Sequence, residues 1–401
     1  MLQPKNLKVN SSNLKRTRCR VWGVTPYTTL HLTPYIFMMN IQVIDLTHPL
    51  WKQTLEKLNH DIYHLPEYMY LESKRIKAIP EAILITEDEK VFFLPYMQRC
   101  GDDLFNCAFK TPEIFDVVSP YGYPGFLLSE AAASQPEFLS LAMQALVQVF
   151  RDKQVCSAFL RLHPLLNENV NQLLDDRSLK VNGSTVSIDL RLDAREIWHQ
   201  TRSEHRNKIN KCKRLGLTAR MVSAKEFMNE FNTLYEETMN RVNARDDYYF
   251  GIEFLREFAE LLGDKVHIGI VEYNEQIASA GLFTECCGIV QYHLGGTKTD
   301  FLKPAPSKLM FDYVRFWAKE RGNHVFHLGG GVGGAKDSLY HFKAGFSKQS
   351  HAFMTLRLIT DQEKYRSLVE LRAKSLKIDV EKILQTEFFP AYRSPNIFNE
   401  S

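Results

Sequence analysis

The chain has 401 residues, 44% hydrophobic and 24% charged, which is the composition of a soluble globular protein. This length exceeds what one compact core usually organises, so two domains are expected. The formal net charge of +3 does not by itself indicate a protein that binds nucleic acid.

The seven cysteines follow neither a zinc-ligand spacing nor a disulfide framework, so a reducing cytoplasm is the expected location. The adjacent Cys286 and Cys287 lie in a β-like run, where neighbouring side chains point to opposite faces. We therefore expect them to pack rather than to do chemistry, and we predict no metal site. No apolar run approaches the roughly 18 residues that a membrane-spanning helix needs.

The N-terminal residues 1–37 are basic and show little periodicity, which predicts a poorly ordered extension over 1–40. An upstream translation start and a transit peptide are the alternatives, but the amphipathic helix typical of a transit peptide is missing. From Ile41 the pattern changes to a strand followed by an amphipathic helix at Pro49–Asn59.

The first half continues with a hairpin, a strand, a proline- and glycine-rich loop, a helix and a strand. These are expected at Ala82–Thr86 with Lys90–Met97, Ile114–Val118, Ser119–Phe126, Pro136–Phe150 and Val155–Leu162.

The second half opens with a strand and three helices and then repeats the order of the first. The opening elements are expected at Val186–Leu190, Ala194–Leu215, Lys225–Asn240 and Phe254–Leu262. The repeated ones are expected at Lys265–Glu272 with Gln276–Glu285, Gly288–Leu294, the loop Gly295–Ser307, Lys308–Arg321 and His324–Leu328.

The matching order predicts a duplicated α/β unit, since the offset of roughly 170–185 residues is of domain size. We predict domains at 41–180 and 181–375, the second of them catalytic, and a C-terminal tail at 376–401. A glycine-dense turn follows the last predicted strand, with glycines at 329–331, 333 and 334. Such a run indicates a backbone that needs positive φ or approaches a ligand closely.

Several motifs together resemble one family. They are W-x3-R-x3-R-x3-N-K from Trp198, Y-x2-T-M-x-R from Tyr235, YHLGGT from Tyr292, LGGG-x5-DSLY-x-FK-x-GFS from Leu328, HDIYHLPEY at 60–68 and SPYGYPG at 119–125. With the element order, they resemble GNAT acyltransferases of the FemAB/FemX-like, or acetyltransferase 6, branch over residues 41–360. The resemblance implies a mixed α/β fold of two tandem GNAT-like domains.

The resemblance also implies transfer of an acyl or aminoacyl group to an amine of a cell-envelope or polysaccharide precursor. The donor substrate is expected to be acyl-CoA or, in FemX-type members, aminoacyl-tRNA, with no tightly bound cofactor. The loop Gly295–Ser307 departs from the Q/R-x-x-G-x-G/A pattern of ordinary GNATs. Such a transfer needs no protein nucleophile, since the amine attacks the donor directly.

Three residues are the catalytic candidates. Lys343 matches the FK lysine of the family, which the resemblance assigns to the reacting carbonyl or donor phosphate. His293 ends a predicted strand where a GNAT cleft opens, and a pKa near neutrality suits a base, although a structural histidine is the alternative. Asp337 is a competing carboxylate, or else the N-cap of the next helix.

Donor and acceptor residues follow from position and charge. The predicted donor-binding residues are Gly295, Gly296, Thr297, Ser307, Gly329, Gly330 and Gly331, through backbone N–H groups. The predicted acceptor- or tRNA-binding residues are Tyr121, Tyr123, Arg161, His163, Arg202, Arg206 and Arg241. For Arg202 and Arg206 the alternative is a solvated helix face, for Arg241 a surface ion pair with Glu237, and for the other four packing.

The leading hypothesis is a cytoplasmic, monomeric N-acyltransferase acting on a small-molecule or lipid-linked amine. The first alternative is an aminoacyltransferase that contacts the tRNA acceptor end. The second is a non-catalytic module that binds a nucleotide sugar.

Overall fold

The computed structural model describes residues 39–101, 115–170, 174 and 178–395. Of the predicted extension over 1–40, only Met39, which is buried, and Asn40 fall within this part. The described strands form one mixed sheet in the order β1-β2-β3-β4-β6-β13-β7-β12-β11-β10-β9-β8, with β5 paired to β3.

The first repeat comprises the elements up to β6. Its strands are β1 (Asn40–Asp45), β2 (Ile79–Glu87), β3 (Lys90–Cys100), β4 (Phe115–Val118), β5 (Leu127–Leu128) and β6 (Val155–Arg161). Its helices are α1 (Pro49–Leu55), the 3₁₀ turn η2 (Ile62–His64), α2 (Pro66–Ile76), α3 (Glu130–Ala133) and α4 (Pro136–Asp152).

The second repeat comprises β8 to β12 and α5 to α10. Its strands are β8 (Thr218–Val222), β9 (Val266–Tyr273), β10 (Gln276–Cys286), β11 (Ile289–Thr297) and β12 (Val325–Gly330). Its helices are α5 (Ala194–Gln200), α6 (Ser203–Arg214), α7 (Ala224–Arg241), α8 (Ile252–Leu262), α9 (Pro306–Glu320) and α10 (Ser338–Lys343).

Two further strands are exchanged between the repeats. β7 (Leu179–Asp189) follows the first repeat in sequence but pairs with β12 of the second. β13 (Gln349–Ile359) follows the second repeat but pairs with β6 of the first. β7 and β13 also pair with each other, so one sheet runs through the whole molecule.

Both repeats place a helix between two parallel strands, as the matched element order predicts. In the first repeat α4 connects β4 to the parallel β6, and in the second α9 connects β11 to the parallel β12. α4 and α9 both begin with a proline in the first turn, where its missing N–H costs nothing. The expected tandem α/β architecture is therefore confirmed.

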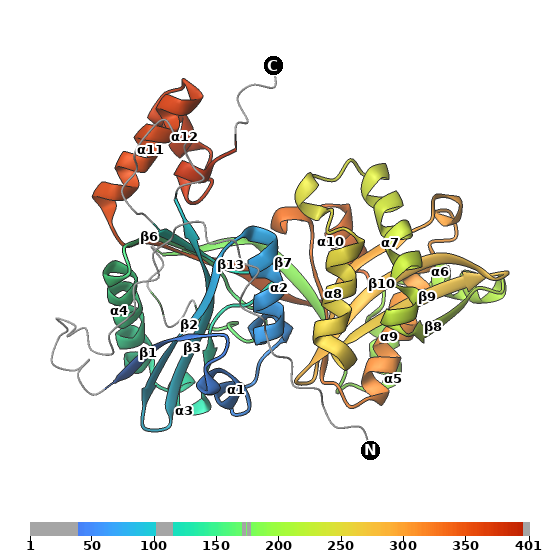
Figure 1. Cartoon of the computed structure of the whole chain (residues 1–401). Coiled ribbons are helices and arrows are strands. Elements are labelled where there is room, and N and C mark those ends of the chain that lie inside the picture. The colour runs from blue at the N-terminus through green and yellow to red at the C-terminus, as the bar shows by residue number, and fades with distance from the viewer. Residues whose placement is uncertain (1–38, 102–114, 171–173, 175–177, 396–401) are drawn as a thin grey trace.

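Helices cover both faces of the sheet (Figure 1). In the first repeat α4 packs on one face, while α1 and α2 pack on the other. In the second repeat α7 and α8 cover one face and α5, α6 and α9 cover the other. The first repeat reaches across to α8, because Tyr68 of α2 contacts Phe258 with ring centroids 6.2 Å apart.

Among the boundaries that differ from those predicted, two lie in the segments of the second repeat that surround the candidate site. The helix expected at Ala194–Leu215 is two helices, broken at Thr201 and Arg202. Tertiary contacts hold the break, since Arg315 donates to Thr201 Oγ1 at 2.7 Å and Arg202 N–H donates to the Gly345 carbonyl at 2.8 Å. The loop expected from Gly295 begins after Thr297, because β11 continues to that residue.

The chain after β13 packs on the first repeat. α11 (Gln362–Leu376) and α12 (Val380–Gln385) form a small cluster with Cys156 of β6. Figure 1 shows these helices, in red, above the first repeat and away from the second. Part of the predicted tail thus has regular structure, and the predicted domain limits remain a prediction.

Candidate functional site

The strands β11 and β12 separate partway along their length. Their parallel ladder joins Ile289–Gln291 to Val325–His327, while β11 runs on to Thr297 and β12 to Gly330. Beyond the ladder, β11 stays paired with β10 on its other side and β12 stays paired with β7. The two diverging edges carry backbone N–H and C=O groups that a ligand with amide groups can pair with.

Lys343, at the end of α10, brings an ammonium to this opening. Its Nζ donates to the Gly330 carbonyl at 2.6 Å and lies 5.5 Å from the centre of the Tyr292 ring. The side chain is buried, and burial lowers the pKa of Lys343 to about 7, although the charge of Asp337 acts in the opposite direction. An ammonium and a neutral amine are therefore both populated near neutral pH.

Polar groups from both repeats converge on Gly329. A β-carbon at Gly329 would lie 3.2 Å from Lys343 Nζ, 3.5 Å from Tyr123 Oη and 3.9 Å from Gln291 Nε2. The φ of Gly329 is +76°, which favours glycine. The Tyr123 hydroxyl also accepts a hydrogen bond from the Gly330 N–H at 3.4 Å, so this N–H group faces a hydroxyl. Tyr123 and Lys343, both predicted as site residues, are thus brought together.

His327 and Gln291 belong to this cluster and were not predicted. His327 Nδ1 lies 2.5 Å from Gln291 Oε1, an acceptor, so Nδ1 carries the hydrogen. His327 Nε2 is then an acceptor without a hydrogen-bond partner among the described residues. Burial lowers the pKa of His327 well below its usual range. The sequence feature that could have identified them is a polar residue inside an otherwise apolar strand, His327 in VFHLGG and Gln291 in IVQYHL.

His293 lies on the same strand as Gln291, inside an aromatic pocket. Its ring stacks on Phe258 with centroids 5.2 Å apart and meets the edge of Tyr121 at 5.8 Å. Burial lowers the pKa of His293 to about 4, so the expected pKa near neutrality is wrong. A neutral His293 can accept a hydrogen bond at pH 7, but it holds a proton weakly.

Arg161 ends β6 and His163 follows it, and the two residues have different surroundings. The Arg161 guanidinium donates to the Ser119 carbonyl at 3.4 Å and lies 5.1 Å from the Phe159 ring, and burial lowers its pKa. His163 is fully buried, with Nε2 3.1 Å from Asp61 Oδ2 and Nδ1 accepting two backbone N–H groups. His163 therefore already has partners for both ring nitrogens, as the packing alternative supposed.

Asp337 has the N-cap geometry that was its alternative. Its Oδ1 accepts the Tyr340 N–H at 2.8 Å, and its Oδ2 accepts the Val332 N–H at 2.9 Å. A β-carbon at Gly331 would lie 2.3 Å from Asp337 Oδ1, so that glycine makes room for the cap. These bonds lock the glycine turn onto α10 and so position Lys343.

The glycines of β11 have packing partners. A β-carbon at Gly295 would lie 2.4 Å from Tyr292 Oη, and one at Gly296 would lie 2.6 Å from Leu234 of α7. Thr297 N–H donates to Thr238 Oγ1 at 3.0 Å. Ser307 lies in the first turn of α9, where backbone N–H groups are free of helical partners.

The predicted arginines of the second repeat differ in exposure. Arg202 is exposed at the start of α6. Arg206 donates to the carbonyls of Trp198 and His199 at 3.4 and 3.3 Å, so it caps the end of α5. Arg241 donates to Thr299 Oγ1 at 3.0 Å and lies 3.8 Å from Glu237, the ion pair given as its alternative.

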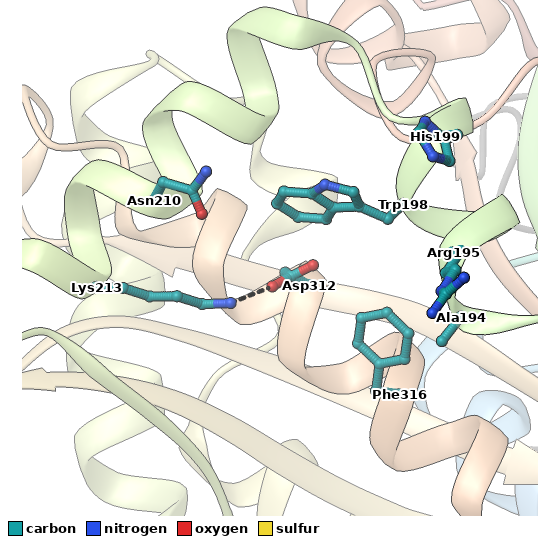
Figure 2. A pocket seen from close by; sticks show the side chains of 8 residues that line it. All are labelled: Ala194, Arg195, Trp198, His199, Asn210, Lys213, Asp312 and Phe316. Carbon is teal, nitrogen blue, oxygen red and sulfur yellow. Dashed lines mark hydrogen bonds and ion pairs between the residues drawn. The ribbon is translucent and has the colours of Figure 1, made fainter.

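A separate open cavity of about 360 Å³ lies between α5, α6 and α9. Figure 2 shows the Trp198 ring, the Phe316 ring and, between their heights in the view, the ion pair of Lys213 with Asp312, which is 3.0 Å long. Its lining includes none of Lys343, His293 and Tyr123.

The cysteine pair contradicts one expectation. Cys287 has a φ of +45°, so the strand alternation ends at Cys286 and both sulfur atoms come within 4.8 Å of the His60 ring nitrogens and of each other. The hydrogen bond from Cys286 and that from His60 lower the pKa of Cys287 to about 4, against the effect of burial. The prediction that the two side chains point to opposite faces is wrong.

Comparison with known proteins supports the family resemblance. Residues 199–343 match the model of the acetyltransferase (GNAT) domain. The structure is similar to the crystal structure of FemX, with a TM-score of 0.61 and 13% identity over 81% of this chain and 99% of that one. A tandem GNAT protein from the clavulanic acid biosynthesis pathway gives a TM-score of 0.43 and 10% identity over 80% and 98% of the two chains. No curated protein matches the sequence.

The second repeat thus matches a GNAT acetyltransferase domain over residues 199–343, and the fold of the chain is similar to that of FemX. At this identity the likeness extends to the fold alone. Among the described residues, every helix is too short or too polar to cross a membrane.

Proposed function

We propose that this protein is an N-acyltransferase that moves an acyl group from acyl-CoA to an amine of a cell-envelope or polysaccharide precursor. The observation that carries this proposal is the divergence of β11 and β12 beside α9, with a buried ammonium at its mouth. An extended thioester donor with amide groups fits the two diverging strand edges, and a GNAT domain uses acyl-CoA as its substrate.

In the proposed reaction the neutral amine attacks the thioester carbonyl, so that a C–N bond forms and the C–S bond breaks. In the tetrahedral intermediate the carbonyl oxygen is an oxyanion, and the Lys343 ammonium is the hydrogen-bond donor that stabilises it. The amine loses one proton and the leaving thiolate gains one. Tyr123 and the unpartnered His327 Nε2 are the polar groups beside Gly329 that would orient the amine.

The acceptor would enter from the first repeat. The loop after β4 brings Tyr121 against His293 and Tyr123 against His327, with ring centroids 5.8 and 5.3 Å apart. Among the described residues, no carboxylate forms an ion pair with Arg161, which would pair with an acidic group of the precursor.

A FemX-type reaction with aminoacyl-tRNA is the second candidate, favoured by one observation. The basic helix α6 begins beside the segment that carries Lys343, because Arg202 N–H donates to the Gly345 carbonyl at 2.8 Å. The exposed cations of α6 and the Trp198 ring of the neighbouring cavity suit a phosphate backbone and a stacked base.

The test incubates the purified protein with labelled acetyl-CoA or with charged tRNA, each with a pool of envelope and polysaccharide precursors. Transfer from acetyl-CoA that is insensitive to ribonuclease supports the proposal. Transfer from charged tRNA alone supports the second candidate. No transfer from either donor, together with saturable binding of a nucleotide sugar, would establish a binding module and overturn both.

A further inference from the structure

Three potential metal ligands meet where the two repeats touch, outside the site described above. The ligand atoms of His60, Cys286 and Cys287 all lie within 4.8 Å of one another. Cys287 Sγ is 3.4 Å from His60 Nδ1 and 3.6 Å from His60 Nε2. His60 is half-buried, Cys286 is buried and Cys287 is exposed, so an ion could enter from solvent.

The backbone at Cys287 is unusual for its residue type. Its φ of +45° is in the left-handed region, and the next residue, Gly288, has a φ of +78°. Glycine, asparagine or aspartate is the ordinary occupant of such a turn position. The cysteine therefore tolerates a strained backbone, and this strain is what turns its sulfur toward the sulfur of Cys286 and the His60 ring.

The imidazole of His60 has a backbone partner on one ring nitrogen. Its Nδ1 lies 2.8 Å from the Leu58 carbonyl, an acceptor, so Nδ1 carries the hydrogen and Nε2 presents a lone pair. A backbone carbonyl on the second ring nitrogen is the usual support of a metal-binding histidine.

We propose that His60, Cys286 and Cys287 bind a thiophilic metal ion of the Zn²⁺ class through two sulfurs and one imidazole nitrogen. Two thiolates with an imidazole select soft or borderline ions over Mg²⁺ and Ca²⁺. Three protein ligands leave one tetrahedral position for water or an external ligand.

The ion would connect the two repeats. His60 belongs to the segment between α1 and η2, whereas the cysteines form the turn between β10 and β11. Asp61, the residue after His60, has its Oδ2 3.1 Å from His163 Nε2. The centroids of the His163 and His327 rings are in turn 6.3 Å apart. Metal binding would therefore fix the segment that supports the floor of the β11–β12 opening.

The test uses the full chain, freed of any affinity tag, reduced with a phosphine and stripped of metal by a chelator. Titration with Co²⁺ should give one equivalent of intense d–d absorption with a thiolate charge-transfer band, and Zn²⁺ should displace both. Cys287→Ser and His60→Ala should each weaken Co²⁺ binding on the order of 100-fold, since each removes a ligand. Cys212→Ser is the matched control, because Cys212 is buried in α6 and contacts the Pro304 carbonyl.

A second readout is independent of colour. Zn²⁺ should raise the melting temperature of the wild type and of Cys212→Ser by a few degrees, on the order expected for an ion that binds only the folded state. It should leave that of Cys287→Ser unchanged. Equal Co²⁺ affinity in all variants, or a Cys286–Cys287 disulfide that persists in the reduced protein, would overturn the proposal.

Discussion

The two parallel strand pairs of the molecule are built alike but end differently. In the first repeat, all of β4 is paired with β6, from Phe115 to Val118. In the second, only the first residues of β11 are paired with β12, and the strands then part. The same element order therefore produces one closed pair and one open pair.

The closed pair is sealed by the C-terminal segment. Tyr392 donates to Asp116 at 3.3 Å and lies 2.7 Å from Ser157 Oγ, which joins β4 to β6. Arg99 and Arg393 both bind the buried Asp116 carboxylate. In the open pair, the buried Lys343 donates to a backbone carbonyl and has no directly bound carboxylate among the described residues. A carboxylate with several partners therefore joins the closed pair, whereas the incompletely paired Lys343 and His327 mark the open one.

The largest effect is expected where the closed pair loses its central carboxylate. Asp116→Ala leaves the half-buried Arg99 and Arg393 without their shared carboxylate, which should lower the free energy of unfolding by about 3–5 kcal/mol. Denaturant titration measures the loss. Glu257→Ala, which breaks an exposed pair with Lys74, should cost about 1 kcal/mol or less. Equal losses in the two variants would contradict the comparison.

In the open pair, a substitution should lower the rate of acyl transfer. Lys343→Met keeps the volume of the side chain but removes the ammonium, and should lower the transfer rate by about 10²–10³-fold. The rate per folded molecule is the quantity to compare. Lys336→Met, an exposed lysine of the same turn, is the control and should change the rate by less than about twofold. A Lys343→Met rate equal to the wild type would remove the role given to this lysine.

The burial of Lys343 should also appear in the dependence of stability on pH. Its pKa in the fold is about 7, below the 10.5 of a free lysine, so between these values the unfolded chain binds the proton and the fold does not. The free energy of unfolding should therefore rise with pH across this window, by at most about 1.4 kcal/mol per unit. Lys343→Met should be more stable than wild type below pH 7, and its advantage should shrink toward pH 10. A constant difference in melts at pH 6, 8 and 10 would contradict the lowered pKa.

The smallest effect is expected from removal of the Tyr123 hydroxyl, which the first repeat contributes to the opening between β11 and β12. Tyr123→Phe removes the acceptor of the Gly330 N–H but keeps the ring contacts with His327 and Phe353. The stability loss should be about 1 kcal/mol or less, and the KM for the acceptor should rise a few-fold. A loss of rate as large as that of Lys343→Met would mean that Tyr123 takes part in the reaction itself.

Local patterns sufficed for the order of the elements. Apolar spacing and turn residues indicated the hairpin, strand, helix and strand of both repeats, because periodicity reports the face that each element buries. The exchange of β7 and β13 could not be foreseen, since strand pairing across the chain leaves no local signal. The break at Thr201 depends likewise on a distant Arg315.

The candidate site was predictable in part. Lys343, Tyr123 and Gly329 were predicted separately and lie together in the fold. The N-cap role of Asp337 was one of the two roles expected from the sequence. The low pKa of His293 was not expected, because it depends on burial against Phe258, which residue type and spacing do not encode.

The exchanged strands have a consequence for biosynthesis. When the ribosome has released the first repeat, β6 still lacks β13, its partner on one side. That edge stays open until nearly the whole second repeat has been made, and an open edge is a template for wrong pairing between nascent chains. The first repeat therefore cannot complete its part of the sheet until β13, which follows the second repeat in the sequence, has been made.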